Sequence, residues 1–305
     1  MLLLIEQTLN GMQFGVFLFL ISAGLTLVFG VMNLVNLAHG SLYMIGAYFA
    51  ATIFAWSGSF LVAIMLTIPA SFIVGIGLEV IALRTLYDRD HLDQVLATFG
   101  LILFFNELIR IIWGPEGQPM SVPEALSGHI DILPGVPYPA FRIAIIVVGL
   151  LVAMFLFVLI TRTRVGMLIR AGASNRSMVG ALGVNIRLLY TLVFGLGAVL
   201  AGIAGLMAGP LLAVEPGMGE DMLILAFVVI VIGGIGSIRG ALIASILLGI
   251  VETVGRSILP FMLEAVLSNE AAQTAGPALA SILIYLLMTG VLFFKPQGLF
   301  PSRSG

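Results

Sequence analysis

The stretch NGMQFGVFLFLISAGLTLVFGV, residues 10–31, decides the fold class of this chain. It carries no formal charge, and about 20 apolar residues suffice for a helix to cross the roughly 30 Å hydrocarbon layer of a bilayer. It belongs to a longer uncharged region, because 72 residues separate Glu6 from Glu79 and only His39 among them can carry a charge. This region is long enough for three crossings, so we expect a polytopic membrane protein.

The composition supports the same class. Hydrophobic residues fill 60% of the 305 positions and Asp, Glu, Lys and Arg only 9%, whereas about 25% of a soluble domain is charged. The mean hydropathy of +1.19 is too high for a chain that exposes its surface to water. The net charge is −2, from 13 basic and 15 acidic side chains, so no basic excess is available to bind nucleic acid. We therefore expect membrane lipid, and no nucleic acid, among its partners.

Several kinds of active site are excluded because the residues they need are missing. The chain has no cysteine, which rules out disulfides, zinc–thiolate sites and iron–sulfur clusters. The three histidines, His39, His91 and His129, are far apart and lack the spacing of a metal site. Lys295 is the only lysine and does not follow a glycine-rich phosphate loop. We therefore expect no catalytic residue, no metal and no cofactor in this chain.

Apolar segments recur along the whole sequence. They are continuously apolar and do not alternate over about ten residues, so they predict an all-α membrane protein and not a β-barrel. The N-terminus, MLLLIE, lacks a basic region and a small-residue cleavage site, so we expect it to open a mature first helix. About nine spans are predicted, within a range of eight to ten. They cover residues 10–31, 37–56, 60–83, 94–113, 141–161, 188–212, 222–238, 240–260 and 277–294.

The basic residues indicate an orientation, because Lys and Arg concentrate on the cytoplasmic side of membrane proteins. The segment 162–187 holds five arginines and no acid, whereas 114–140 and 215–221 contain no Lys or Arg. If nine spans alternate, ten basic residues fall on one side, which places the N-terminus outside and the C-terminus in the cytoplasm. These ten are Arg84, Arg89, Arg162, Arg164, Arg170, Arg176, Arg187, Arg239, Lys295 and Arg303.

Two connections are too long for simple turns. In the cytoplasmic segment 162–187, the runs RAGASNR (170–176) and MVGALGV (178–184) predict a short amphipathic helix followed by a turn at glycine. A surface helix of small residues offers a contact for another subunit, and anchoring on the membrane surface is the alternative. The extracytoplasmic connection 114–140 holds six prolines and is predicted to form an extended or turning lid. It is either a docking surface or a plain linker.

A polar stripe interrupts the apolar sequence at VMNLVNLAHG, residues 31–40. Asn33, Asn36 and His39 recur every three positions, which places them along one slowly drifting face of a helix. Polar side chains at membrane depth suggest a function. The alternative is that these groups bond to neighbouring helices or satisfy a helix break.

Glycines form a second conspicuous pattern. In GGIGSIRG, residues 233–240, we expect Gly234, Gly236 and Gly240 to break or sharply turn the chain between the seventh and eighth spans. A phosphate-binding loop is disfavoured there, because no strand precedes the run and no lysine follows it. Glycines four residues apart, as at Gly11 and Gly15, predict close packing between helices in lipid.

Two pairs of opposite charges are spaced to meet on one helix face. They are Glu107 with Arg110 and Glu252 with Arg256. Neutralised structural contacts are the favoured reading of both pairs, ahead of a proton relay. Glu252 stands out because it follows Gly240 by 12 residues, which places it about 18 Å into the bilayer at about 1.5 Å per residue.

The sequence closely resembles the permease subunits of bacterial branched-chain amino acid ABC importers. The resemblance rests first on GLTLVFGVMNLVNLAHG (24–40) and GAY (46–48), and it extends over nearly the whole chain. Further matching stretches are GMLIRA (166–171), GVN (183–185), AGIAG (201–205), GIGSIRG (234–240) and KPQGLF (295–300).

The resemblance implies a single transmembrane permease domain, residues 1–305, in the bacterial cytoplasmic (inner) membrane. It implies a second similar permease, two cytoplasmic ATPase subunits and an extracytoplasmic solute-binding protein that delivers leucine, isoleucine or valine. The segment 162–187 looks like the coupling segment on which the ATPases dock, although RAGA (170–173) replaces the common Glu-Ala-Ala signature of importers. The coupling residues it implies are Arg170, Ala171, Gly172, Asn175 and Gly183.

For the translocation pathway we expect Asn33, Asn36, His39 and Tyr43 as lining residues. Sparse polar groups in a conduit would let both the zwitterion and the apolar side chain of a leucine-like solute pass without holding either. Two alternatives stay open. The same architecture could import urea, a short amide or another amino acid, or the chain could act as an autonomous channel or secondary carrier, which would leave the long basic segment unexplained.

Overall fold

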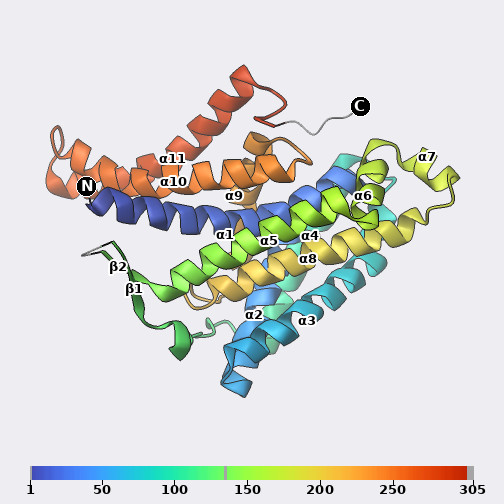
Figure 1. The fold of residues 1–305 in the computed structure, drawn as a ribbon, viewed down its shortest axis with the longest axis horizontal. Helices are drawn as coiled ribbons and strands as arrows, with labels where there is room; N and C mark the ends of the chain where they lie inside the picture. The colour runs from blue at the N-terminus through green and yellow to red at the C-terminus, as the bar shows by residue number, and fades with distance from the viewer. Residues whose placement is uncertain (1, 134–135, 301–305) are drawn as a thin grey trace.

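The computed structural model describes residues 2–133 and 136–300, so Pro134 and Arg303 lie outside the described residues. Long helices dominate it (Figure 1). They are α1 (Leu2–Met32), α2 (His39–Ser57), α3 (Phe60–Ile81), α4 (His91–Trp113), α5 (Ala140–Arg162), α8 (Ile186–Ala208), α9 (Met218–Gly233), α10 (Ile238–Leu263) and α11 (Asn269–Phe294). The short elements are η1 (Leu83–Leu86), η2 (Glu124–Leu126), α6 (Arg164–Ser174) and α7 (Arg176–Ala181), with strands β1 (His129–Leu133) and β2 (Val136–Pro139).

The helices confirm a polytopic helical membrane protein. Within the described residues, seven helices are long and apolar enough to cross a bilayer. The group leaves out α2 and α9, although both coincide with segments that the sequence predicts as spans. Helix α9 has only 16 residues, or about 24 Å at 1.5 Å per residue.

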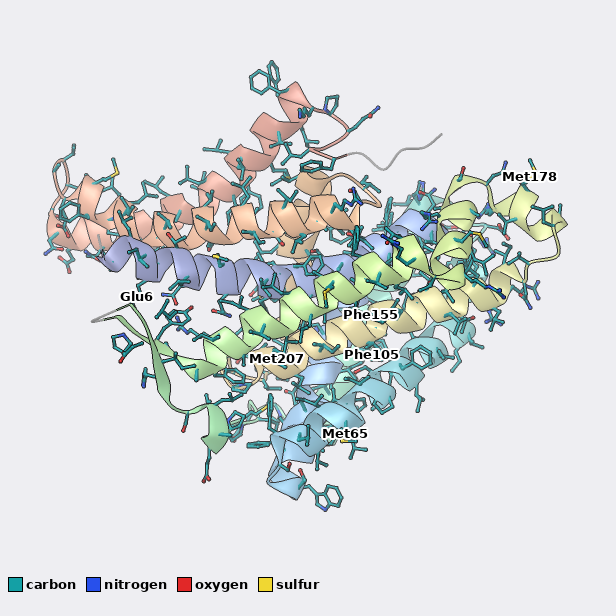
Figure 2. The ribbon with its side chains drawn as sticks, in the orientation of Figure 1. Glu6, Met65, Phe105, Phe155, Met178 and Met207 are labelled. Atoms are coloured by element: carbon teal, nitrogen blue, oxygen red, sulfur yellow. The ribbon has the colours of Figure 1, made fainter. Side chains whose placement is uncertain are left out.

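The helices form a buried centre and an exposed periphery. Most residues of the apolar windows of α1 and α8 are buried, 83% and 78% respectively, against only 11% for α11 and 17% for α5. On the peripheral helices, large apolar side chains such as Met65 and Phe155 point away from the core (Figure 2). Apolar faces of this kind suit contact with lipid, where the backbone is satisfied within each helix.

Glycines allow α1 and α10 to cross closely. A Cβ atom added at Gly11 would lie 2.7 Å from Ile250 Cα, and one added at Gly15 would lie 2.6 Å from Ile246 Cα. Both distances are too short for a side chain, so the packing predicted from this glycine pair is confirmed.

The all-helical expectation omits one small element in the proline-rich connection. Strands β1 and β2 pair antiparallel, with His129 opposite Pro139 and Ile130 opposite Tyr138. The prolines restrict the connection to extended backbone, which a strand pair accepts at its ends.

Two of the connections lie at opposite ends of the long axis. The N-terminus and the β1–β2 hairpin lie at one end, and α6 and α7 lie at the other (Figure 1). Glu6 and Met178 mark these two ends in Figure 2. The predicted coupling segment and the proline-rich connection are therefore far apart.

Candidate functional site

The segment 162–187 folds into α6 and α7, which project from one end of the helix bundle (Figure 1). Each helix begins at a side-chain cap. The Thr163 hydroxyl accepts a hydrogen bond from the Gly166 N–H at 3.0 Å, and the side-chain oxygen Oδ1 of Asn175 accepts one from the Met178 N–H at 2.9 Å. Asn185 caps α8 in the same way, at 3.1 Å from the Leu188 nitrogen. These caps hold two short helices in place where neither has the length to be stable alone.

The outer surface of α6 and α7 combines charge with exposed apolar groups. Arg170 and Asn175 are exposed, Ala171 is half-buried, and Met178 and Leu182 leave 60% and 78% of their surface uncovered. Two glycines shape the segment from within. Gly172 is buried, and a Cβ atom added to it would lie 3.1 Å from Leu189 Cδ2. Gly183 has a φ of 88°, which sets the turn after α7. Exposed apolar groups rimmed by charge are typical of a surface that binds another protein.

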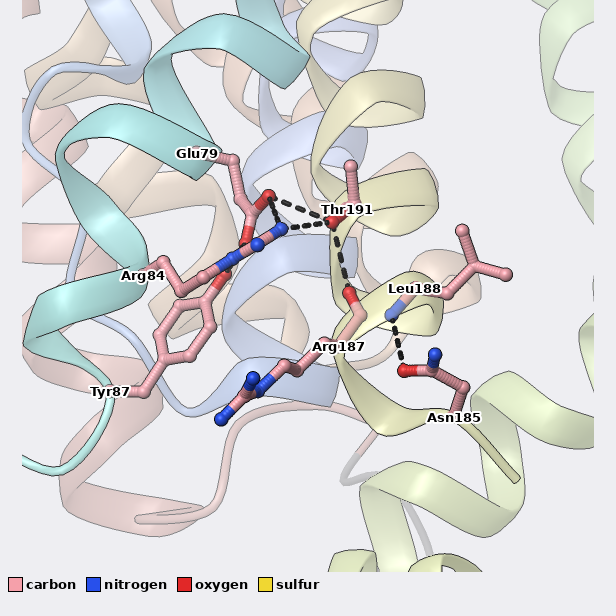
Figure 3. A network of polar contacts seen from close by, with 7 residues as sticks. All are labelled: Glu79, Arg84, Tyr87, Asn185, Arg187, Leu188 and Thr191. Carbon is pink, nitrogen blue, oxygen red and sulfur yellow. Dashed lines mark hydrogen bonds and ion pairs between the residues drawn. The ribbon is translucent and has the colours of Figure 1, made fainter. Parts of the chain in front are cut away.

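A polar network anchors this end of the bundle (Figure 3). Glu79, at the end of α3, is fully buried. Arg84 donates to both of its carboxylate oxygens, at 3.2 and 3.0 Å, and Thr191 of α8 lies 2.8 Å from Oε2. The Tyr87 hydroxyl donates to Oε1. The network therefore joins α3, the turn after it and α8 through one carboxylate.

The contact with Glu79 changes the pKa of two groups that lie outside the helical spans, Tyr87 and Arg84. Burial, followed by the hydrogen bond to Glu79, raises the pKa of Tyr87. The hydrogen bond to Glu79 raises the pKa of Arg84. Both shifts keep the network as one charged pair with a neutral phenol. Sequence reasoning missed it because Thr191 lies 112 positions from Glu79 and carries no pattern of its own.

A cavity of about 640 Å³ lies beside the network. Its wall combines the end of α1, the α3–α4 connection and the α6–α7 segment. Asn33, predicted for the pathway, and Gly172, predicted for coupling, line this same cavity, together with the charged Arg89, Asp90 and Arg176. Asn33 ends α1 in a left-handed conformation with φ of 51°, which asparagine tolerates better than most residues.

The other predicted pathway residues lie in the packed core, and the single helical face predicted for Asn33, Asn36 and His39 does not form, because α1 ends at Met32 and α2 begins only at His39. Asn36, His39 and Tyr43 have no accessible surface. Asn36 Oδ1 accepts from Ala38 N–H at 3.1 Å, and His39 Nε2 lies 3.2 Å from the Ile21 carbonyl oxygen. Asn36 Nδ2, His39 Nδ1 and the Tyr43 hydroxyl have no hydrogen-bond partner among the described residues. Their role in a pathway stays a prediction.

The glycine-rich turn lies between α9 and α10. Helix α9 ends at Gly233, and Gly234 and Gly236 take φ values of 101° and 77°. Gly240 packs directly on Gly233, since a Cβ added there would lie 2.0 Å from the Gly233 carbonyl oxygen. The C-terminal KPQGLF stretch covers this turn, because Phe300 N–H donates to the same carbonyl at 3.0 Å. Two stretches that carry the resemblance therefore contact each other.

Both predicted ion pairs form. Arg110 NH1 lies 2.9 Å from Glu107 Oε1, and Arg256 NH2 lies 2.6 Å from Glu252 Oε1. Their surroundings differ, because the Glu107 side chain is 65% exposed and the Glu252 side chain only 9%. Within the described residues, no group of three or more His, Cys, Asp or Glu is arranged to hold a metal ion.

Comparison with known proteins identifies the family. A family model described as "Branched-chain amino acid transport system / permease component" matches residues 7–292. The chain is 34% identical over 251 residues to the high-affinity branched-chain amino acid transport system permease protein BraD of Pseudomonas aeruginosa, which covers 78% of this chain and 81% of the relative. It is 29% identical over 258 residues to LivH of Salmonella typhimurium, a permease protein of the same description. This alignment also covers 78% of this chain and 81% of the relative.

A more distant relative has the same description. The probable branched-chain amino acid transport permease protein LivH of Methanocaldococcus jannaschii is 28% identical over 239 residues, 73% of this chain and 72% of the relative. No solved structure matches the chain. With the family model covering almost the entire sequence, the chain belongs to the family of permease components of branched-chain amino acid transport systems.

Proposed function

We propose that this chain is the membrane-spanning permease subunit of an ATP-binding-cassette importer that moves branched-chain amino acids across the bacterial inner membrane. The observation that carries the proposal is the family match over residues 7–292. The exposed α6–α7 surface supports it, since an importer permease needs a cytoplasmic surface on which its ATPase subunits can dock.

The proposed topology has nine spans, an external N-terminus and a cytoplasmic C-terminus. Nine helices of 16 or more residues among the described residues coincide with the nine predicted segments. The arginines of α6 and α7 lie at the end opposite the N-terminus and the proline-rich connection (Figure 1). This asymmetry favours a cytoplasmic location for α6 and α7.

The proposed partners are those that the family membership implies. ATP hydrolysis belongs to two separate cytoplasmic subunits, which agrees with a single lysine that does not belong to a phosphate loop. A second homologous permease completes the membrane part, and an extracytoplasmic binding protein delivers the solute. Arg170, Ala171, Gly172, Asn175 and Gly183 form or shape the proposed docking surface for the ATPases.

In the proposed mechanism, closure of the ATPases pushes on α6 and tilts α5 and α8, which converts an outward-open pathway to an inward-open one. The ATPases bind the two states differently, as such coupling requires. Asn33, Asn36, His39 and Tyr43 would meet the solute as the helices part. The unpartnered polar atoms of the last three support this idea, because leaving a buried polar group unpaired costs about 1–3 kcal/mol in the closed packing.

The experiment is to purify the tagged chain in mild detergent, identify its companions by mass spectrometry and assay uptake of leucine, isoleucine, valine and urea in proteoliposomes. We expect two ATPase copies, a second permease and ATP-dependent leucine uptake. A chain that purifies alone and moves solute without ATP would contradict the proposal. Uptake of urea, without uptake of the three amino acids, would show that the solute is urea and not a branched-chain amino acid.

A second measurement tests the docking surface. Replacing Ala171 with Trp, or Gly183 with Val at its positive φ, should reduce ATPase association and uptake together. The matched control is Gly100→Ala, because Gly100 is exposed on α4 and a Cβ there meets no atom within 4 Å. Lost uptake with intact association would show that the docking assignment is wrong.

A further inference from the structure

A second cavity, of about 600 Å³, opens between α1, α5, α9, α10 and α11. It lies toward the end that carries the N-terminus, because Asn10 is near the start of α1, Arg142 near the start of α5 and Asp221 near the start of α9. Its volume is in the range of sites that bind small molecules, roughly 300–1,000 Å³. We call it the outer cavity.

The outer cavity concentrates charge where the chain otherwise has little. Ten of the 13 basic residues belong to the segments assigned to the cytoplasmic side, and the remaining three are Arg110, Arg142 and Arg256. Two of those three, Arg142 and Arg256, line the outer cavity, and they face two acids, Asp221 and Glu252. The cavity is therefore neutral overall but carries both signs.

The existing contacts leave part of this charge unused. Arg256 donates to Glu252 Oε1 from Nε at 2.7 Å and to the Ser281 hydroxyl at 3.2 Å. Arg142 donates to the Asn10 side chain. Glu252 Oε2 is buried and has no hydrogen-bond partner among the described residues. Asp221 is exposed, and its side chain makes no hydrogen bond or ion pair within the part of the chain that the structure describes.

Lipid cannot be the natural neighbour of these groups. Glu252 is 14 residues into α10, about 21 Å from its start, and Arg256 is half-exposed one turn further on. Charged side chains at such depth face water, a partner or a solute, because exposure to hydrocarbon is costly. A carboxylate oxygen has two lone pairs, so Oε1 of Glu252 can accept a further hydrogen bond from a ligand in the cavity besides the one from Arg256.

The lining of the outer cavity also includes apolar side chains. Among them are Phe14 of α1, Met222 and Leu225 of α9 and Ile284 of α11. The cavity thus offers acceptors for a cation, arginine donors for an anion and a hydrophobic surface beside both. A zwitterion with a branched alkyl side chain matches this combination, whereas a urea-like solute would use neither charge.

We infer that the outer cavity binds a free α-amino acid with an apolar side chain, with its ammonium at Glu252 and Asp221, its carboxylate at Arg142 and Arg256, and its side chain against Phe14, Met222, Leu225 and Ile284. The inference rests on the proposed function and adds to it the place where this subunit holds the solute. It is a site separate from the polar residues Asn33, Asn36 and His39 between α1 and α2.

The test is photolabelling of the purified importer complex with a diazirine analogue of leucine, followed by mapping of the labelled peptides. We expect label on peptides from α1, α9 and α11, displaced by excess leucine but not by 4-methylpentanoate or 3-methylbutylamine, which each lack one charge. Label confined to other helices, or equal displacement by the one-charge analogues, would overturn the inference.

Variants test the same site through both labelling and leucine uptake. Glu252→Gln should lower labelling and leucine uptake at least tenfold, and Leu225→Trp should do the same by filling the cavity. Glu107→Gln is the matched control, since Glu107 is also paired with an arginine and is 16 residues into its helix. Equal labelling in all three variants would overturn the inference.

The outcomes separate this inference from the proposed function. Normal leucine uptake with label elsewhere overturns only the binding site. If the unmodified complex takes up no leucine, the proposed solute fails and the inference fails with it. If Glu252→Gln releases the second permease on purification, the outer cavity is a subunit interface and not a solute site.

Discussion

Glu79 and Glu252 are both carboxylates buried on long helices, at 0% and 6% exposure, yet their surroundings differ in kind. Glu79 receives hydrogen bonds on both oxygens, from Arg84, Tyr87 and Thr191 (Figure 3). Glu252 is bonded on one oxygen only and lines a cavity. A saturated carboxylate holds a structure together, whereas a half-saturated one beside open space retains the capacity to bind something else.

The difference arises from the elements around each residue. Glu79 lies where α3 packs against α8, and the turn after α3 folds Arg84 and Tyr87 back over it. Glu252 lies on α10 beside a cavity lined by residues of five helices, and its hydrogen-bond partner is Arg256 of its own helix. The same residue type therefore serves anchoring in one place and, in our inference, recognition in the other.

Replacing Glu79 with Gln should produce the largest loss of stability. The amide removes the charge that Arg84 needs and places an N–H₂ group among donors, so we expect the free energy of unfolding to fall by about 3 kcal/mol. Titration with SDS in mixed micelles, followed by near-UV circular dichroism, measures it. A change in unfolding free energy under about 0.5 kcal/mol would show that Glu79 does not stabilise the fold as we infer.

The same substitution at Glu252 should affect transport far more than stability. Gln retains an oxygen for Arg256, which is half-exposed, so the unfolding free energy should fall by less than about 1 kcal/mol. Leucine uptake at limiting concentration should fall about tenfold, equivalent to about 1.4 kcal/mol. The unfolding free energy and the leucine uptake are both measured on the same purified complex. A loss of stability as large as that of Glu79→Gln would mean that the two carboxylates are alike.

Thr191→Val tests the least obvious member of the anchoring network. The hydroxyl lies within hydrogen-bond distance of Glu79 Oε2, Arg84 NH2 and the Arg187 carbonyl oxygen, and valine preserves the shape. We expect a loss of about 1 kcal/mol, measured in the same SDS titration, with leucine uptake per folded complex unchanged. Reduced uptake by folded complexes would connect the network to transport itself.

Glu107→Gln should have the smallest effect. Its ion pair with Arg110 is exposed on both sides, and such pairs contribute about 0–1 kcal/mol. We expect unfolding free energy and leucine uptake to stay within error of the unmodified protein. A clear loss of uptake would show that charge on α4 also serves transport, and the contrast with Glu252 would be weaker.

Much of the fold could be predicted from local sequence. The runs of apolar residues located the helices, and the glycines of 233–240 located the break between α9 and α10. The i, i+3 and i, i+4 spacings predicted both ion pairs correctly. Missing from this reading were the hairpin of β1 and β2 and the network at Glu79, because both depend on residues that the chain brings together only after folding.

The candidate sites were predictable only in part. The sequence placed Asn33 and Gly172 in separate functional groups, and the structure brings them to one cavity. It grouped Asn36, His39 and Tyr43 as pathway residues, and the structure places all three inside the packed core. The helical face predicted for Asn33, Asn36 and His39 does not form, because residues 33–38 connect α1 to α2. Spacing in the sequence predicts a shared face only where one helix runs through all the residues.

The sequence by itself determined the membrane class of this protein, the positions of its long helices and the pairs of charges that meet within one helix. These properties are sums over neighbouring residues, so hydropathy and periodicity carry them. Only the tertiary structure decided that Glu79 is saturated, that Glu252 retains a free oxygen and that two arginines and two acids line one cavity. Those facts depend on how helices far apart in sequence cross, which no local pattern contains.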